Sequence, residues 1–131
     1  MLKANRIKSE PQPSDGLRIS IMNRHTLNDG VTPDAGIAPE LYKVWLPQLA
    51  PPASLLGDYY KRGLAWEEFE DKYNNYLDVP EINDRLRRLI QIAKLATVTV
   101  LCIEDTPDFC HRRLLVERSS LIEPTLEVEL K

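Results

Sequence analysis

The chain contains little cysteine, little glycine and no long hydrophobic run. Its 131 residues include two cysteines and five glycines. Two cysteines exclude a disulfide framework, and we interpret both as free thiols. The longest nearly apolar stretch, residues 93–103, is interrupted by Lys94 and is too short to span a bilayer, and residues 1–6 lack the apolar core of a signal peptide. We therefore expect a cytoplasmic protein without a membrane segment.

An excess of positive charge is also absent. The 17 Lys and Arg residues are outnumbered by 20 Asp and Glu residues, which gives a formal net charge of -3. No broad positive field is available for nucleic-acid phosphates, so we expect no general nucleic-acid binding. The hydrophobic content of 43% and charged content of 28% are ordinary for a globular protein. The length predicts a single domain over residues 1–131, with one site.

Four segments have the composition of β-strands. Residues 2–8 and 17–23 are short apolar segments separated by turn-forming residues. Residues 97–103 are β-branched and apolar on both alternating faces, which predicts a central strand covered by helices on each side. Residues 125–130 alternate strictly, as is typical of a half-exposed edge strand. Residues 24–39 show no apolar stripe and are predicted to be an irregular loop that lines a site.

Helical patterns occupy most of the remaining chain. Residues 40–46 and 54–62 are predicted to form short helices that are separated by consecutive prolines. Aromatic and apolar residues recur at helical spacing from Trp66 to Leu77, and apolar residues do so from Ile82 to Ala93. A further helix is predicted near the C-terminus. We therefore predict an α/β fold: one compact domain with a mostly parallel central sheet flanked by helices.

The densest group of reactive side chains follows the predicted central strand. Thr106 is the predicted cap of the last helix and Pro107 its first residue, which would place Cys110 in the first helical turn. Free amides and the helix dipole favour an anion there, so a lowered pKa of the Cys110 thiol is expected. The same amides could instead bind a phosphate or carboxylate ligand, with Arg112 completing the contact.

We select Cys110, His111 and Glu104 as candidate catalytic residues. Glu104 ends the strand as a general base or hydroxyl acceptor, and His111 serves proton transfer or orientation. The alternative is that Cys110 and His111 only end a buried helix face, because Leu114 and Leu115 each follow one turn later.

Arg24, His25 and Arg112 are the candidate ligand-binding residues. If residues 17–23 pair in parallel with the central strand, Arg24 and His25 approach Glu104 and Cys110 at one edge of the sheet. We assign no metal site, because the spacing of Cys102, Cys110 and His111 matches no standard zinc pattern, and because Cys102 is expected to be buried by packing.

The chain resembles the family called domain of unknown function 488, which includes a YeaO-like group. The resemblance covers nearly the whole length. Its main motif is Cys-x-Glu-x-x-Pro-x-x-Cys-His-Arg. The residues that match it here are Cys102, Glu104, Pro107, Cys110, His111 and Arg112. The resemblance implies an α/β fold with a compact sheet, and it implies no particular reaction.

YeaO-like members are also similar over residues 14–18, 45–51 and 66–69. One segment departs from their pattern. They tend to carry Asp-Arg-Leu-Trp-Pro-Arg-Gly after the second strand, whereas residues 23–30 here read Asn-Arg-His-Thr-Leu-Asn-Asp-Gly. Only the first arginine and the glycine are retained, so an activity that needs the other residues would be altered or lost.

The leading hypothesis is a site for a small anionic ligand, phosphorylated or nucleotide-like, which an enzyme could use. The expected partner is that ligand, and the sequence assigns no cofactor and no oligomeric state. One alternative is a noncatalytic interaction protein in which the motif stabilises the junction of strand and helix. Another is a thiol-based redox protein. Rapid alkylation of Cys110 would favour the thiol chemistries.

Overall fold

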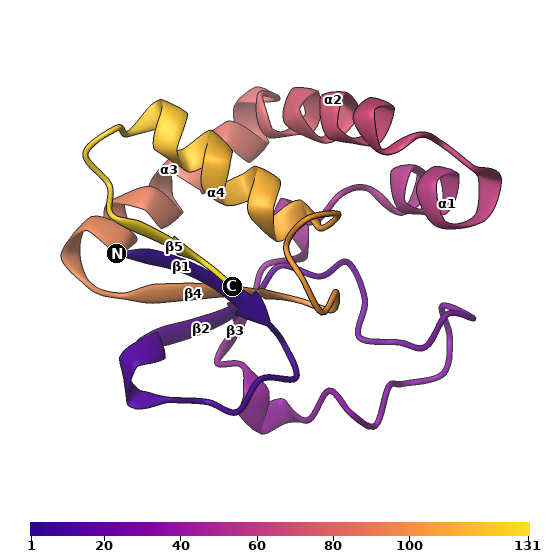
Figure 1. Cartoon of the computed structure of the whole chain (residues 1–131), viewed down its shortest axis with the longest axis horizontal. Helices are drawn as coiled ribbons and strands as arrows, with labels where there is room; N and C mark the ends of the chain where they lie inside the picture. Colours follow the sequence, from indigo (N-terminus) through magenta and orange to yellow (C-terminus); the bar gives the residue numbers. More distant parts are fainter.

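Five parallel strands form the sheet at the centre of the computed structural model, which describes residues 1–131 (Figure 1). The strand order is β3-β2-β4-β1-β5, and every pairing is parallel. The strands are β1 (Leu2–Arg6), β2 (Leu17–Ser20), β3 (Val44–Trp45), β4 (Val98–Cys102) and β5 (Val128–Leu130). β4 is the central strand and β5 an edge strand, as predicted, and the prediction of an α/β fold with a parallel sheet is confirmed.

The pairing register brings the carboxyl ends of β1, β2 and β4 to the same edge. Arg6 and Ser20 lie opposite Cys102 and Leu101 of the central strand, respectively. The amino end of β2 requires Gly16, which has a φ of 61°. A Cβ atom at this position would lie 2.0 Å from the carbonyl oxygen of Thr97. Only glycine therefore allows β2 to approach β4 so closely.

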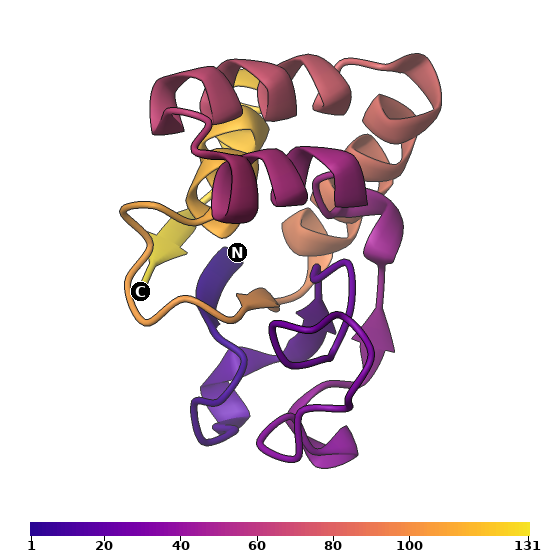
Figure 2. The ribbon, with the colours of Figure 1, turned by 90° about the vertical axis from the view of Figure 1, so that its right-hand side faces the viewer.

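Four α-helices lie on one side of the sheet (Figures 1 and 2). They are α1 (Ala53–Arg62), α2 (Trp66–Leu77), α3 (Pro80–Leu95) and α4 (His111–Ile122). The stripe predicted for α2 is buried at Phe69, Tyr73 and Leu77. The stripe predicted for α3 is buried between Leu86 and Ala93. These apolar faces join the helix-facing residues of the strands in one core cluster.

The other side of the sheet is covered by loops, so the prediction of helices on each side of β4 is wrong. Ile37, from the irregular segment, packs in a small cluster with Leu101 of β4. Arg18 of β2 is buried on this side and binds the carboxylate of Asp15 at 2.7 Å and the carbonyl oxygen of Leu41 at 2.6 Å. The segment has too few apolar residues for a helix face, yet it buries the sheet with single apolar contacts and satisfied polar groups.

The prediction of a helix over residues 40–46 is also wrong. This segment forms a 3₁₀ turn at Pro39–Leu41 and then β3, which pairs in parallel with β2. The amides of Lys43 and Leu46 donate to carbonyl oxygens of β2 at 2.9 and 2.8 Å. A seven-residue segment gains little as an isolated helix, whereas an unpaired sheet edge offers backbone partners to Val44 and Trp45.

The last helix begins later than the sequence predicts. Cys110 is the residue before α4 and has extended backbone angles, with φ of -136° and ψ of 141°. Thr106 is exposed in a loop, and Pro107 accepts a turn hydrogen bond from the Cys110 amide at 3.2 Å. The Arg113 guanidinium donates to the carbonyl oxygen of Asp108, which holds that carbonyl outside the helix. Cys110 is therefore not in the first helical turn.

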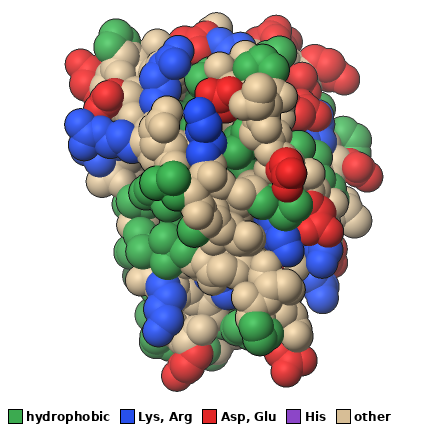
Figure 3. All heavy atoms as spheres, turned by 90° about the vertical axis from the view of Figure 1, so that its left-hand side faces the viewer, with side chains coloured by type: hydrophobic (Ala, Val, Ile, Leu, Met, Phe, Trp, Pro, Cys, Tyr) green, Lys and Arg blue, Asp and Glu red, His purple; other side chains and the backbone are tan.

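The amino ends of the strands lie at the left-hand side of Figure 1, and Figure 3 shows this face of the molecule. Basic and acidic side chains both occur on that face, together with hydrophobic side chains, and no histidine is visible there. None of the four α-helices combines the length and the apolar content that crossing a bilayer requires.

Candidate functional site

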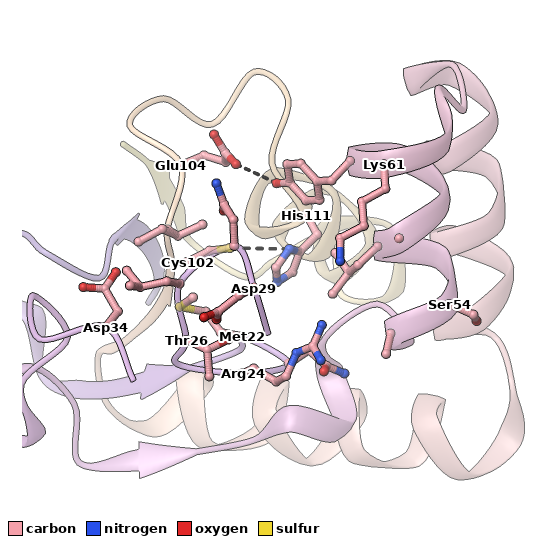
Figure 4. A pocket seen from close by; sticks show the side chains of 18 of the residues that line it. Met22, Arg24, Thr26, Asp29, Asp34, Ser54, Lys61, Cys102, Glu104 and His111 are labelled. Carbon is pink, nitrogen blue, oxygen red and sulfur yellow. Dashed lines mark hydrogen bonds between the residues drawn. The ribbon is translucent and has the colours of Figure 1, made fainter. Parts of the chain in front are cut away.

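A hollow of about 1060 Å³ lies at the carboxyl ends of β2 and β4 (Figure 4). Helix α1 contributes one wall, and the irregular segment after β2 contributes another. The charged side chains that line it are Arg24, Asp29, Asp34, Lys61, Arg62 and Glu104. This is the edge at which parallel sheets commonly bind ligands.

The structure brings three of the six predicted site residues to this hollow. Arg24, Glu104 and His111 line it, and Cys102 lies beside them. The parallel pairing of β2 with β4, on which the predicted convergence depended, is present. Cys110, Arg112 and His25 are not lining residues. Cys110 and Arg112 lie behind the floor, with 2% and 0% of their surface exposed.

His25 packs away from the hollow. Its ring lies between Tyr42 and Trp45, with centroid distances of 4.7 and 4.3 Å. Its Nε2 atom shares a hydrogen bond of 2.7 Å with Ser20 Oγ. Burial lowers the pKa of His25, because the charged ring is poorly solvated there. His25 therefore anchors the start of the irregular segment against β2 and β3.

Glu104 forms a polar contact with helix α1. Its Oε1 atom accepts a hydrogen bond of 2.6 Å from the Tyr60 hydroxyl (Figure 4). Burial and the neighbouring carboxylate raise the pKa of Tyr60 well above its usual value, so the phenol is the donor. Sequence reasoning missed Tyr60, because its side chain gives no signal beyond that of an ordinary helical tyrosine.

Two basic residues of α1 were also missed, Lys61 and Arg62. Arg62 is bound to the Asp58 carboxylate at 2.7 Å and to the Ser54 carbonyl oxygen. Lys61 is exposed and forms no hydrogen bond or ion pair within the chain, and the same is true of Arg24. The only sequence signal for Lys61 and Arg62 was their position at the end of an amphipathic helix.

His111 forms part of the floor and is held by the backbone of β2. Its Nε2 atom lies 2.7 Å from the Ile21 carbonyl oxygen, which can only accept, so Nε2 carries the proton. The unprotonated Nδ1 atom then faces Cys102 Sγ at 3.5 Å. Burial lowers the pKa of His111 to about 4, despite the bond to Ile21, and the charge of Arg112 adds to this effect. The ring is neutral near pH 7.

Arg112 is fully buried and contacts no side-chain carboxylate. It donates to the carbonyl oxygens of Glu104 at 2.7 Å and Lys131 at 3.1 Å, and to Cys110 Sγ at 3.2 Å. Its Nη2 atom has no hydrogen-bond partner. The other buried arginine, Arg18, is paired with the carboxylate of Asp15. Among the side chains that Arg112 contacts, only Cys110 can carry a negative charge, as a thiolate.

The two cysteines differ in their acidity. Burial opposes ionisation of Cys110, but a hydrogen bond from Cys102 and the charge, amide and guanidinium of Arg112 outweigh it and lower its pKa to about 7. Burial, together with the bond to Cys110, raises the pKa of Cys102 well above its usual value. The two sulfur atoms and a ring nitrogen of His111 all lie within 4.8 Å of one another. The site thus contains a compact Cys-His cluster.

The sequence matches a family model over residues 2–122, and the model is described as the active DUF488-N3 subclade. The chain belongs to the DUF488 family. No curated protein and no solved structure matches it.

The family's motif residues connect the ends of three strands. In this DUF488 protein His111 binds the Ile21 carbonyl oxygen after β2, and Arg112 binds those of Glu104 after β4 and Lys131 after β5. Arg113, which follows the motif, forms an ion pair with Glu117 at 2.8 Å. The motif therefore fixes the edge of the sheet that borders the hollow.

The departure from the YeaO-like pattern lies in a wall of the hollow. The two retained residues, Arg24 and Gly30, are in contact, because a Cβ atom at Gly30 would lie 2.9 Å from Arg24 Nη1. Gly30 also has a φ of 72°. Gly30 thus lies against the arginine that faces the hollow, and the replaced residues other than His25 line the same hollow.

Proposed function

We propose that this DUF488 protein binds a small anionic molecule, phosphorylated and of nucleotide size, in the hollow at the strand ends, and that it acts on this molecule as an enzyme. The observation that carries the proposal is that two cations, Arg24 and Lys61, line the hollow without a direct hydrogen bond or ion pair. They approach the hollow from different elements, and Figure 4 shows their charged ends pointing toward the same region. The volume of about 1060 Å³ accommodates a nucleotide-sized ligand.

The roles of the lining residues follow from their positions. Arg24 and Lys61 neutralise the anion. Lys61 takes the anion-binding role that the sequence analysis assigned to Arg112. Glu104 is the acid/base group or the acceptor for a ligand hydroxyl, and the Tyr60 hydroxyl holds its carboxylate at 2.6 Å.

Thermal unfolding with added anions tests the binding. Inorganic phosphate and adenosine monophosphate should each raise the melting temperature more than sodium chloride of equal ionic strength. Arg24→Ala and Lys61→Ala should each abolish the increment, because each removes a cation that binds the anion. Both side chains are exposed, so their loss should have little effect on the melting temperature without added anions. Arg85→Ala is the matched control, since Arg85 is exposed on α3 outside the hollow, and it should keep the full increment.

The results separate three cases. A larger increment for the nucleotide than for phosphate supports a nucleotide-sized ligand. Equal increments support a smaller phosphorylated one. If Arg24→Ala and Lys61→Ala retain the increment, or if chloride gives the same rise, the hollow is not an anion site and the proposal is wrong.

A second candidate is a noncatalytic protein in which the motif stabilises the junction of strand and helix. The hydrogen bonds from His111 and Arg112 to three strand-end carbonyls favour it. Glu104 separates the two functions, because it joins this network through its backbone carbonyl and not through its side chain. In the noncatalytic case Glu104→Gln should leave every binding property of the protein unchanged.

A further inference from the structure

We propose that Cys102, Cys110 and His111 form a zinc site with three protein ligands. Thiolate sulfur and imidazole nitrogen are the atoms that zinc prefers, and the three ligand atoms here lie within 4.8 Å of one another. The distance from Cys102 Sγ to His111 Nδ1 is 3.5 Å. Zinc–sulfur and zinc–nitrogen bonds of about 2.3 and 2.0 Å at a tetrahedral angle give a separation of about 3.5 Å. The side chains are therefore close to the positions that a metal ion requires.

The groups around the cluster support the same role. A histidine that binds a metal through one ring nitrogen usually donates the other N–H to a carbonyl or carboxylate oxygen. His111 does so through Nε2, which binds the Ile21 carbonyl oxygen at 2.7 Å and leaves the lone pair of Nδ1 toward the sulfur atoms. Arg112 Nη1 lies 3.2 Å from Cys110 Sγ, where it stabilises a thiolate.

Two of the three ligands border the hollow. Cys102 and His111 line the hollow, whereas Cys110 lies behind them. Structural zinc sites are closed by four protein ligands, whereas catalytic sites use three and leave one position for water or substrate. The arrangement here corresponds to the second class. Glu104 lines the same hollow and is available to act on a molecule bound at the fourth position.

The charge of the filled site selects its fourth ligand. Two thiolates balance the charge of the zinc ion, and the buried Arg112 guanidinium, which contacts no side-chain carboxylate, adds a positive charge beside Cys110. An anionic fourth ligand would neutralise it. Metal binding goes beyond the proposed function and does not depend on it, because the three ligands are complete without Arg24 or Lys61.

The sequence spacing concealed this site. Seven residues separate the two cysteines, and this spacing belongs to no common zinc motif. The ligands come instead from the end of β4 and the beginning of α4, and the loop over residues 103–109 returns the chain to the same place. The tertiary fold thus supplies the proximity that a short zinc motif supplies within a loop.

Cobalt titration of the full, untagged and freshly reduced chain tests the site. One equivalent of Co²⁺ should give a thiolate-to-cobalt charge-transfer band and the strong visible d–d bands of a tetrahedral site, and Zn²⁺ should remove both. Cys102→Ser and His111→Gln should lose this spectrum. His25→Gln replaces the only other histidine, which lies outside the cluster, and should keep it.

The wild-type titration alone can overturn the proposal. If folded, reduced protein leaves cobalt with the weak spectrum of the hydrated ion, the cluster holds no metal, even if a variant fails to fold. Loss of the spectrum in His25→Gln together with its retention in His111→Gln also overturns it. Cobalt binding that persists in Arg24→Ala and Lys61→Ala supports the metal site whether or not these variants bind phosphate, so the failures of the two proposals are distinguishable.

Discussion

The two buried arginines should differ in what their removal costs, because only Arg18 has a buried side-chain carboxylate as its partner. Arg18→Met leaves the Asp15 carboxylate buried at 6% exposure without its partner at 2.7 Å. Breaking a buried ion pair in this way typically costs about 3–5 kcal/mol. Arg112→Met leaves no buried side-chain carboxylate behind. It leaves the Glu104 carbonyl oxygen unpaired, at about 1–3 kcal/mol, and the exposed Lys131 can bind water instead.

Removing the Arg112 charge also relieves its own desolvation, so the net loss for Arg112→Met should stay near about 1–3 kcal/mol. Urea unfolding at pH 7, followed by far-ultraviolet circular dichroism with a reductant and a chelator, measures both values. Arg88→Met is the control, because Arg88 forms an exposed ion pair with Asp84 and should lose less than about 1 kcal/mol. If Arg112→Met loses as much as Arg18→Met, Arg112 has a full counter-ion in the metal-free protein, and our account of its environment is wrong.

Two further predictions concern a glycine and a histidine. Gly16→Ala should lower the free energy of unfolding by about 3 kcal/mol or more, because the new Cβ atom would lie 2.0 Å from the Thr97 carbonyl oxygen. Gly63 has a φ of 77° and open space around it, so Gly63→Ala should lower the free energy by only about 1–2 kcal/mol. Urea unfolding measures both values. His25 has a lowered folded-state pKa, so its contribution is complete above the unfolded pKa near 6.5 and is lost as the pH falls toward the folded value. The stability of the wild type relative to His25→Gln should therefore fall between pH 7.5 and pH 5.5, and an unchanged difference would show that burial does not shift this ring.

Patterns of apolar residues predicted most of the fold because they report burial directly. The stripe from Trp66 to Leu77 is a helix, and the β-branched run before Cys102 is the central strand. The segment over residues 40–46 misled the prediction, because its pairing with β2 depends on an open sheet edge and not on its own sequence. The late start of α4 has a similar cause. Residues 106 and 107 have the sequence signals of a helix start, but the contacts of Arg112 and Arg113 with loop carbonyl oxygens keep this part of the chain outside the helix.

The motif located the site, but it did not indicate which of its residues face the hollow. Glu104 and His111 line the hollow, while Cys110 and Arg112, from the same motif, lie behind it. Adjacent helical residues point in different directions, and without the start of α4 their directions could not be assigned. Lys61 and Tyr60 belong to a helix far from the motif in sequence. Only the placement of α1 over the strand ends brings them to the hollow.

His111 shows why a structural and a functional role of the motif do not exclude each other. One ring nitrogen is fully used by the Ile21 carbonyl oxygen, and that bond fixes both the ring's orientation and its tautomer. The fixed tautomer leaves the other nitrogen as a lone pair beside Cys102, at the edge of the hollow. The contact that stabilises the junction of strand and helix is therefore the same contact that prepares a ligand atom. A variant that merely kept the fold, such as one with an apolar residue in place of His111, would lose that atom. The bond to Ile21 accounts for one ring nitrogen only and gives no reason for the second, unprotonated nitrogen beside Cys102.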